Sequence, residues 1–184
     1  MFAKEMVKQS LPLLIICGIG GIITGSTFSA MRSIFEAIPG LIVVVPGVIA
    51  LRGNISTALG SRLGSAYHLG VIDAENMVNE ELWQNIIGSL LLSFIMSCII
   101  GLLAYITSLL LGVYPNPYIL ISIVIIAGVI SSVILALLTI LIIFLVFRRG
   151  YDPDNITGPA LATFGDVVTI LCIFGSAVLI GGFA

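Results

Sequence analysis

Residues 82–147 read LWQNIIGSLLLSFIMSCIIGLLAYITSLLLGVYPNPYILISIVIIAGVISSVILALLTILIIFLVF and contain no charged side chain. About 20 apolar residues in a helix cross the hydrocarbon core of a bilayer, which is about 30 Å thick. The stretch is therefore long enough for two crossings. The turn signal GVYPNPY at residues 112–118 divides it. We predict membrane helices at about 83–111 and 118–147.

The composition of the whole chain agrees with a membrane protein. Of its 184 residues, 59% are hydrophobic and 9% are charged. Soluble domains carry about a quarter charged residues, and disordered chains combine low hydrophobicity with high net charge. A formal net charge of −2 offers no basic surface to a nucleic acid. We predict an all-α, polytopic membrane protein with a single domain over residues 1–184 and no nucleic-acid partner.

Three further spans complete a prediction of five. Residues 9–31 carry no charge, and this stretch is too long for the apolar region of a typical signal peptide, so it predicts a retained first helix. Proline and glycine interrupt the second span. It either carries polar residues deep into the membrane or ends early in a polar loop that begins near residue 64. The predicted spans are about 9–35, 38–63, 83–111, 118–147 and 156–183.

Five spans place the two termini on opposite sides of the membrane. Positively charged residues favour the cytoplasmic side. Most lysines and arginines fall on the side of the N-terminus, and only Arg32 clearly falls on the other. We expect a multi-pass protein of the plasma or inner membrane, with the N-terminus cytoplasmic and the C-terminus outside.

Asp166 is the charged residue of the last span. Counted from Ile156 at 1.5 Å per residue, it lies about 15 Å deep, near the membrane midplane. A carboxylate there costs several kcal/mol unless it faces water, a cation or a basic partner. Two interpretations follow: Asp166 marks an ion or proton pathway, or it forms an ion pair with Arg52 or Arg62 of the second span.

A stripe of small and polar residues accompanies Asp166. Intervals of four, three, four and three residues place its members on one helical face. Such a face suits either an aqueous path or the close approach of another helix. Because Pro159 has no amide hydrogen, it also frees carbonyl oxygens one turn earlier. The stripe contains Asn155, Pro159, Ala162, Asp166 and Thr169, with Gly158 and Gly165 beside it.

Two other segments contribute candidate polar groups. Asp152 and Asp154, at the entrance to the last span, either cap its helix or attract cations. Proline and glycine interruptions in two separate spans favour a membrane binding site at a discontinuous helix. There Asn54 offers an amide oxygen, and Gly53 provides either exposed backbone or close packing.

One aspartate per chain is a small site for a cation. Two chains related by a two-fold axis would bring two Asp166 side chains together, and a divalent cation would remove the cost of their repulsion. Mg²⁺ fits because it prefers oxygen ligands and keeps several waters. Cys17, Cys98, Cys172 and His68 show no spacing typical of a softer metal. We expect no resident cofactor, with Mg²⁺ as the transported ion.

Two motifs carry a family resemblance. The first is VPGVIALRGN at residues 45–54, continuing to LGSRL at 59–63. The second is DPDNITGP at residues 152–159, continuing to ATFGDVVT at 162–169. Together they resemble the membrane domain of the MgtE family, and more closely its eukaryotic solute-carrier relatives. The five-span layout agrees, so the resemblance covers nearly the whole chain.

The resemblance implies a magnesium-selective channel or transporter that acts as a homodimer. Its pore lies at the dimer interface and is lined by the second and fifth helices. Asp166 matches the aspartate that binds hydrated magnesium, and Ala162 matches a position whose carbonyl faces the ion. Asn54 matches the asparagine of the Gly-Asn motif. Gly158 stands where the family can supply an asparagine, and it offers only backbone.

The sequence also departs from the family pattern. Arg52 stands where bacterial members tend to have glycine and the solute-carrier relatives tend to have a basic residue. Bacterial members carry cytosolic regulatory domains ahead of the membrane part, and the eukaryotic relatives carry two membrane units in one chain. We expect a single unit without regulatory domains, whose homodimer rebuilds the pair.

The resulting prediction is a divalent cation channel or transporter rather than an enzyme, with metal contacts from Asp166, Ala162 and Gly158. A sodium- or proton-coupled exchanger is the first alternative. An integral membrane enzyme or a scaffold without transport is the second, although no nucleophile–base pair supports an enzyme. The predicted pore-lining residues are Asn54, Gly53, Asn155, Pro159, Thr163 and Thr169, and Asp152 and Asp154 form the predicted cytoplasmic mouth.

Overall fold

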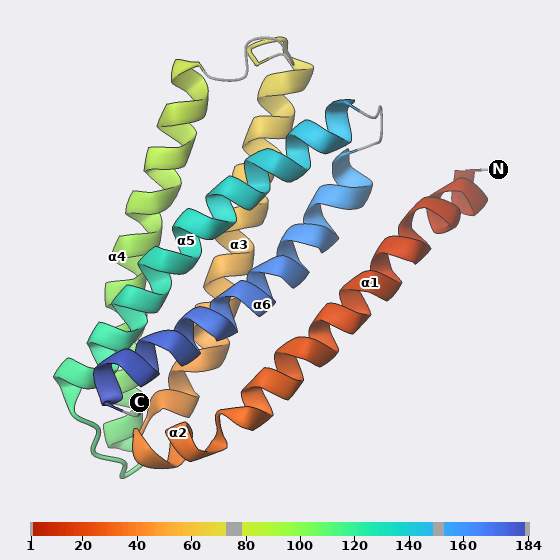
Figure 1. Cartoon of the computed structure of the whole chain (residues 1–184). Helices are drawn as coiled ribbons and strands as arrows, with labels where there is room; N and C mark the ends of the chain where they lie inside the picture. Colours follow the sequence, from red (N-terminus) through yellow and green to blue (C-terminus); the bar gives the residue numbers. More distant parts are fainter. Residues whose placement is uncertain (1, 73–78, 149–152, 183–184) are drawn as a thin grey trace.

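The computed structural model describes residues 2–72, 79–148 and 153–182, and this part of the chain is helical (Figure 1). Five of the described helices are long and apolar enough to cross a membrane. The prediction of an all-α protein with five candidate spans is therefore confirmed. The helices are α1 (Phe2–Ala30), α2 (Arg32–Ala37), α3 (Leu41–His68), α4 (Glu80–Leu110), α5 (Pro117–Arg148) and α6 (Pro153–Gly181).

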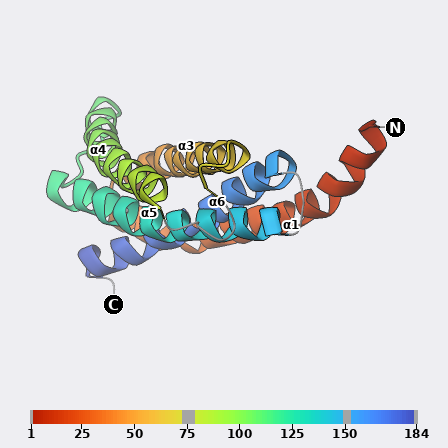
Figure 2. The ribbon, with the colours of Figure 1, turned by 90° about the horizontal axis from the view of Figure 1, so that it is seen from above.

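Four of the long helices form a bundle, and α1 lies outside it. Helix α3 contacts α4, α5 and α6, and α5 contacts α4 and α6. Seen from above, α3 and α4 lie on one side and α5 and α6 on the other (Figure 2). The main contact of α1 is with α6, and its most hydrophobic window contains no buried residue. The N-terminal end of α1 and the C-terminal end of α6 lie at opposite ends of the molecule (Figure 1).

Asparagine side chains cap the starts of α4 and α5. The amide of Leu82 donates to the side chain of Asn79 at 3.0 Å, and two glutamates in the first turn of α4 favour the same helix end. At the start of α5, the amide of Tyr118 donates to the side chain of Asn116 at 3.0 Å. The predicted turn between these two spans is confirmed.

Two predicted boundaries are wrong. The first span was expected at about 9–35, but its helix ends at Ala30 and residues 32–37 form the separate helix α2. This break lets Met31 and Ile34 enter the buried core. The second span was expected at about 38–63, either carrying polar residues deep into the membrane or ending early. The structure shows the first alternative: α3 is a continuous helix that carries its polar residues to His68, past the predicted end. Pro46 costs this helix one backbone hydrogen bond without ending it.

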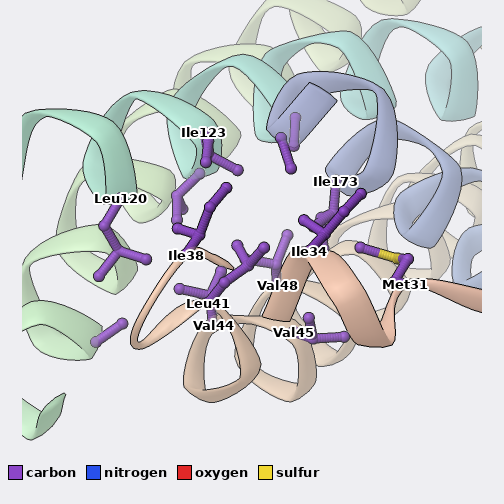
Figure 3. Packing of buried hydrophobic residues seen from close by; sticks show 14 of the residues in the cluster. Met31, Ile34, Ile38, Leu41, Val44, Val45, Val48, Leu120, Ile123 and Ile173 are labelled. Carbon is purple, nitrogen blue, oxygen red and sulfur yellow. The ribbon is translucent and has the colours of Figure 1, made fainter. Parts of the chain in front are cut away.

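The buried apolar side chains gather in two clusters. One joins α2 and the first half of α3 to the start of α5 and the end of α6 (Figure 3). The other surrounds Leu59 and Leu63 of α3, with Leu82 of α4 and Ile143 of α5. The middle of α3 places buried Arg52 and Ser56 between these clusters. A polar layer therefore crosses the centre of the bundle.

Gly40 joins α2 to α3 at a position that only glycine fits. Its φ is +82°, in the left-handed region. A Cβ there would also lie 2.6 Å from the hydroxyl oxygen of Ser108 on α4. The left-handed backbone conformation and the lack of space for a Cβ atom therefore both require glycine at residue 40.

We expect Gly40→Ala to destabilise the protein more than Gly112→Ala does. Gly112 has a similar φ of +77°, but no atom lies within 4 Å of a Cβ built there. Gly112→Ala therefore loses only the free energy of placing a non-glycine residue in the left-handed region, about 1–2 kcal/mol. Thermal unfolding of the two purified variants in detergent measures the difference. Equal melting temperatures would contradict the close contact with Ser108.

Candidate functional site

Helices α3 and α6 approach each other through glycines. A Cβ built on Gly165 of α6 would lie 3.8 Å from the Cα atom of Gly53 on α3. One built on Gly60 would lie 3.0 Å from a methyl carbon of Leu161 and 3.1 Å from that of Thr157. Small residues allow helix backbones to pack closely in a membrane. Gly53 thus takes part in close packing, one of the two roles that its sequence left open.

Asp166 lies beside this crossing. It follows Gly165, and Asn54 follows Gly53, so the contact of the two glycines brings Asp166 and Asn54 to a similar level of the bundle. Asp166 is half-buried and Asn54 is exposed. Among the described residues, Asp166 has neither an ion pair nor a hydrogen bond.

The arginines of α3 are engaged elsewhere. Arg52 donates hydrogen bonds to groups of α4 and α5, and Arg62 donates to the hydroxyl of Ser89 on α4 at 2.9 Å. The ion pair of Asp166 with Arg52 or Arg62, considered from the sequence, is therefore not formed. The carboxylate remains available to a cation or to water.

The other residues of the α6 stripe have different surroundings. Ala162 is exposed, and Gly158 and Pro159 are half-buried. The carbonyl of Pro159 accepts hydrogen bonds from the hydroxyl of Thr163 at 3.1 Å and from the thiol of Cys17 on α1 at 3.4 Å. Within one chain, this carbonyl is therefore engaged at the contact with α1.

Two predicted pore-lining threonines face other parts of the same chain. The methyl group of Thr163 lies against Gly20 of α1. Thr169 is fully buried, and its hydroxyl has no hydrogen-bond partner. The positions of these two residues do not test their proposed roles, which stay predictions.

A polar cavity of about 240 Å³ lies between the second half of α3 and the start of α6. It is found at the same end of α6 as the predicted cytoplasmic mouth. Asp152 of that mouth lies outside the described residues, as do the side chains of Asp154 and Asn155. The cavity is lined by Thr57, Gly60, Ser61, Gly64, Ser65, His68, Thr157 and Gly158.

One face of α3 is exposed although half of its residues carry polar side chains. Its residues recur at intervals of three or four and so share one side of the helix. An amide or hydroxyl that faces hydrocarbon lacks the hydrogen bonds it would make in water, which is unfavourable. This face therefore suits water or another protein surface better than lipid. The exposed α3 face contains Pro46, Ala50, Asn54, Ala58, Ser61 and Ser65.

A single chain offers few direct metal ligands. In the described ranges, no three histidine, cysteine, aspartate or glutamate side chains gather into a metal site. Asp166 supplies one carboxylate, and Asn54 carries an amide oxygen at a similar level of the bundle. Such a set suits a cation that keeps much of its hydration shell, as Mg²⁺ does.

The sequence reasoning missed a serine ladder on α4. Ser89, Ser93 and Ser97 recur at every fourth residue and are all buried. Arg52 donates to the hydroxyl of Ser97 at 2.7 Å and to the carbonyl of Ser93 at 3.1 Å, and it also donates to the hydroxyl of Ser132 on α5. The regular spacing of serines within an otherwise apolar span was the signal for this helix contact.

The fold and this site define the class of the protein: a polytopic helical membrane protein with an unpaired acid inside one candidate span. Residues 45–176, most of the chain, match the model of the MgtE family, which is described as a divalent cation transporter. The chain belongs to the MgtE family. The resemblance seen in its two motifs is thereby confirmed.

The chain is also similar to the eukaryotic solute-carrier relatives. It is 27% identical over 174 residues to Solute carrier family 41 member 2 from Homo sapiens and from Gallus gallus, covering 90% of this chain and 30% of each relative. It is 27% identical over 172 residues to Solute carrier family 41 member 3 from Rattus norvegicus, covering 89% of this chain and 36% of the relative. The chain thus spans about a third of the length of these curated relatives.

The α3–α6 crossing predicts opposite effects of two alanine substitutions. Both replace a helical glycine and so gain up to about 1 kcal/mol in helix propensity. Gly165→Ala places its methyl group at ordinary contact distance, whereas Gly60→Ala forces Leu161 and Thr157 away, at a cost of about 1–3 kcal/mol. In thermal unfolding in detergent, Gly165→Ala should have a higher melting temperature than Gly60→Ala. The reverse order would contradict this packing.

Proposed function

We propose that this protein conducts divalent cations, Mg²⁺ in particular, across the plasma or inner membrane as a homodimer. The pore lies between the two copies and is lined by α3 and α6. The observation that carries the proposal is Asp166, an unpaired carboxylate in the middle of a candidate span beside the exposed α3 face. Membership of a family described as a divalent cation transporter supports it.

The exposed α3 face supports a second copy as its cover. Asn54 is exposed on it, and lipid would leave that amide without hydrogen bonds. A two-fold axis next to α3 and α6 gives both chains a shared polar path. It also brings two Asp166 carboxylates near one another, and a divalent cation offsets their repulsion.

The ion passes with much of its hydration shell. In this proposal Asp166 attracts the hydrated cation. The waters of the cation donate hydrogen bonds to the carbonyl oxygens of Gly158 and Ala162 and to the amide oxygen of Asn54. Mg²⁺ dehydrates reluctantly, so contacts through water suit it better than a closed cage of protein ligands. The remaining proposed pore-lining residues are Gly53, Asn155, Pro159, Thr163 and Thr169.

The proposed orientation places the N-terminus in the cytoplasm and the C-terminus outside. The 240 Å³ polar cavity then opens at the cytoplasmic end, where its hydroxyl groups can hold a hydrated ion. Asp152 and Asp154 concentrate cations at the same mouth. Attraction between acidic residues and a cation acts over about 10 Å at 0.1 M ionic strength, so it extends to this entrance.

We expect Asp166→Ala to lower Mg²⁺ uptake about tenfold or more, because a contact between the ion and a charged group is lost. Uptake is measured in proteoliposomes that contain a magnesium-sensitive dye. The matched control is Glu36→Gln, which removes an exposed acid paired with Arg32 at 3.0 Å and far from this site in sequence. Undiminished uptake by folded Asp166→Ala would refute the pore assignment.

The same proteoliposomes distinguish a channel from an exchanger. Uptake through a channel follows the magnesium gradient and the membrane potential and does not respond to an imposed sodium or proton gradient. An uptake rate that rises and falls with the sodium or proton gradient would replace the channel by the coupled exchanger. In either case the Asp166→Ala comparison still tests the ion site.

The proposed dimer predicts a position-specific cross-link. In a variant whose native cysteines are replaced, Ala162→Cys places a thiol on the exposed side of α6 near the proposed two-fold axis. Oxidation should then give a disulfide-linked dimer on a denaturing gel. Leu137→Cys, on the exposed surface of α5, is the control and should stay monomeric. Cross-linking at Leu137 but not at Ala162 would contradict the arrangement.

A further inference from the structure

A cavity of about 350 Å³ opens between the last turns of α3 and the first turns of α4. Two side chains of opposite charge line it, Arg62 of α3 and Glu81 of α4. Both are exposed, and they do not form an ion pair with each other or with another residue of the described ranges. The transport proposed for Asp166 uses neither charge. The cavity therefore presents a separate positive and a separate negative group to a ligand.

Hydrogen bonds to α4 hold both charged groups in place. The guanidinium of Arg62 donates to the hydroxyl of Ser89 at 2.9 Å, and Ser89 is buried. The carboxylate of Glu81 accepts from the side-chain amide of Asn85 at 3.0 Å, and Asn85 also lines the cavity. A guanidinium has five N–H donors and a carboxylate accepts several hydrogen bonds. Both groups therefore keep the capacity to bind a ligand.

The cavity lies at the level of the lipid headgroups. Arg62 is nine residues beyond Gly53, which lies against the residue that precedes Asp166. At 1.5 Å per residue, Arg62 is about 14 Å from the level of Asp166, and the edge of the hydrocarbon is about 15 Å from the midplane. Trp83, in the first turn of α4, is exposed, as is typical of an aromatic residue at the membrane–water interface.

The two charges lie at different depths. Arg62 contacts Ser89, and Glu81 is eight residues nearer to the start of α4, which corresponds to about 12 Å along the helix. The positive group is therefore the deeper one. A zwitterionic phospholipid has the matching order, with its phosphate next to the glycerol and its ammonium group beyond. An anionic headgroup without an ammonium group would gain from Arg62 but would be repelled by Glu81.

The rest of the lining also suits a lipid. The hydroxyls of Ser61 and Ser65 can donate to phosphate or ester oxygens. Leu69 and Val71 line the same cavity, and 79% and 51% of their surfaces are exposed. Contact with the apolar part of a lipid removes this surface from water, which is favourable.

We propose that this cavity binds the headgroup of one phospholipid that carries a phosphate and a primary ammonium group, as phosphatidylethanolamine does. The phosphate accepts hydrogen bonds from Arg62, and the ammonium group donates to Glu81. A methylated ammonium, as in phosphatidylcholine, has no N–H group to donate. The bound lipid links α3 to α4 at this end of the bundle. This site is separate from the proposed ion path and does not depend on transport.

Native mass spectrometry of the purified protein in detergent tests the proposal. Dioleoyl phosphatidylethanolamine, phosphatidylcholine and phosphatidylglycerol are added separately at equal concentrations. The ethanolamine lipid should bind once per chain, with a Kd about fivefold lower than the others, as expected for one exposed ion pair. Equal affinity for the three lipids would refute the site. A protein dimer that binds no lipid would mean that the second copy fills the cavity, which also refutes it.

Two variants locate the bound headgroup. Folded Arg62→Gln should bind the ethanolamine and choline lipids more weakly, because both lose the contact with their phosphate. Glu81→Gln should lose the preference for phosphatidylethanolamine over phosphatidylglycerol without binding the latter more weakly, because a repulsive charge is removed. A full preference in Glu81→Gln would refute the proposed contact with the ammonium group.

The matched controls change the exposed ion pair of α2, at the opposite end of α3 (Figure 1). Arg32→Gln and Glu36→Gln remove the same charges and should keep the lipid preference of the wild type. Loss of the preference in these variants would mean that it depends on net charge, which would overturn the site. Asp166→Ala should also keep the preference, and this separates the lipid test from the test of transport.

Discussion

Three consecutive residues of α3 face three different surroundings, and the positions of the other helices depend on this arrangement. Arg52 points into the bundle and binds α4 and α5, Gly53 lies against α6, and Asn54 is exposed. Successive residues of a helix are about 100° apart around its axis, so one rotation of α3 sets all three directions. The hydrogen bonds of Arg52 hold that rotation. They therefore help to determine where α6 packs and which face remains open.

The way the helices pack reflects the membrane as solvent. Apolar side chains gain little by leaving lipid for the protein interior, so close backbone approach and hydrogen bonds between helices become important. The glycines of α3 and α6 and the serines of α4 provide these contacts. Helix α1 is different, because most of its surface is apolar and exposed. It meets α6 at Gly20 and through the weak hydrogen bond of Cys17.

The sequence predicted those features that depend on local signals. Long apolar runs identified the five spans, and the prolines near residue 115 identified the turn between α4 and α5. The break after Ala30 was missed because it depends on the burial of Met31 and Ile34 in a cluster made by distant segments. The continuation of α3 to His68 was also missed. Its polar residues there line cavities or contact α4, so they did not mark the helix end.

The site shows the same division between local and long-range information. A single acid in an apolar span was enough to identify Asp166, because hydropathy alone makes it unusual. The partners of Arg52 could not be chosen in the same way. A carboxylate of α6 and the serines of α4 and α5 were both chemically suitable, and the choice depends on the rotation of α3. Hydropathy does not reveal that rotation, although the fourfold spacing of serines on α4 indicates which helix face is polar.

The partners that Arg52 takes decide whether Asp166 can attract a cation. Had Arg52 paired with Asp166, the two charges would cancel, and the carboxylate would attract no cation. Because the serine layer instead holds Arg52 on the α4 and α5 side of α3, the acid stays free of an arginine partner within the described part of the chain. A fixed positive charge near a cation path still repels the ion through a medium of low dielectric constant. The hydrogen bonds that hold Arg52 on the α4 and α5 side of α3 therefore also limit that repulsion.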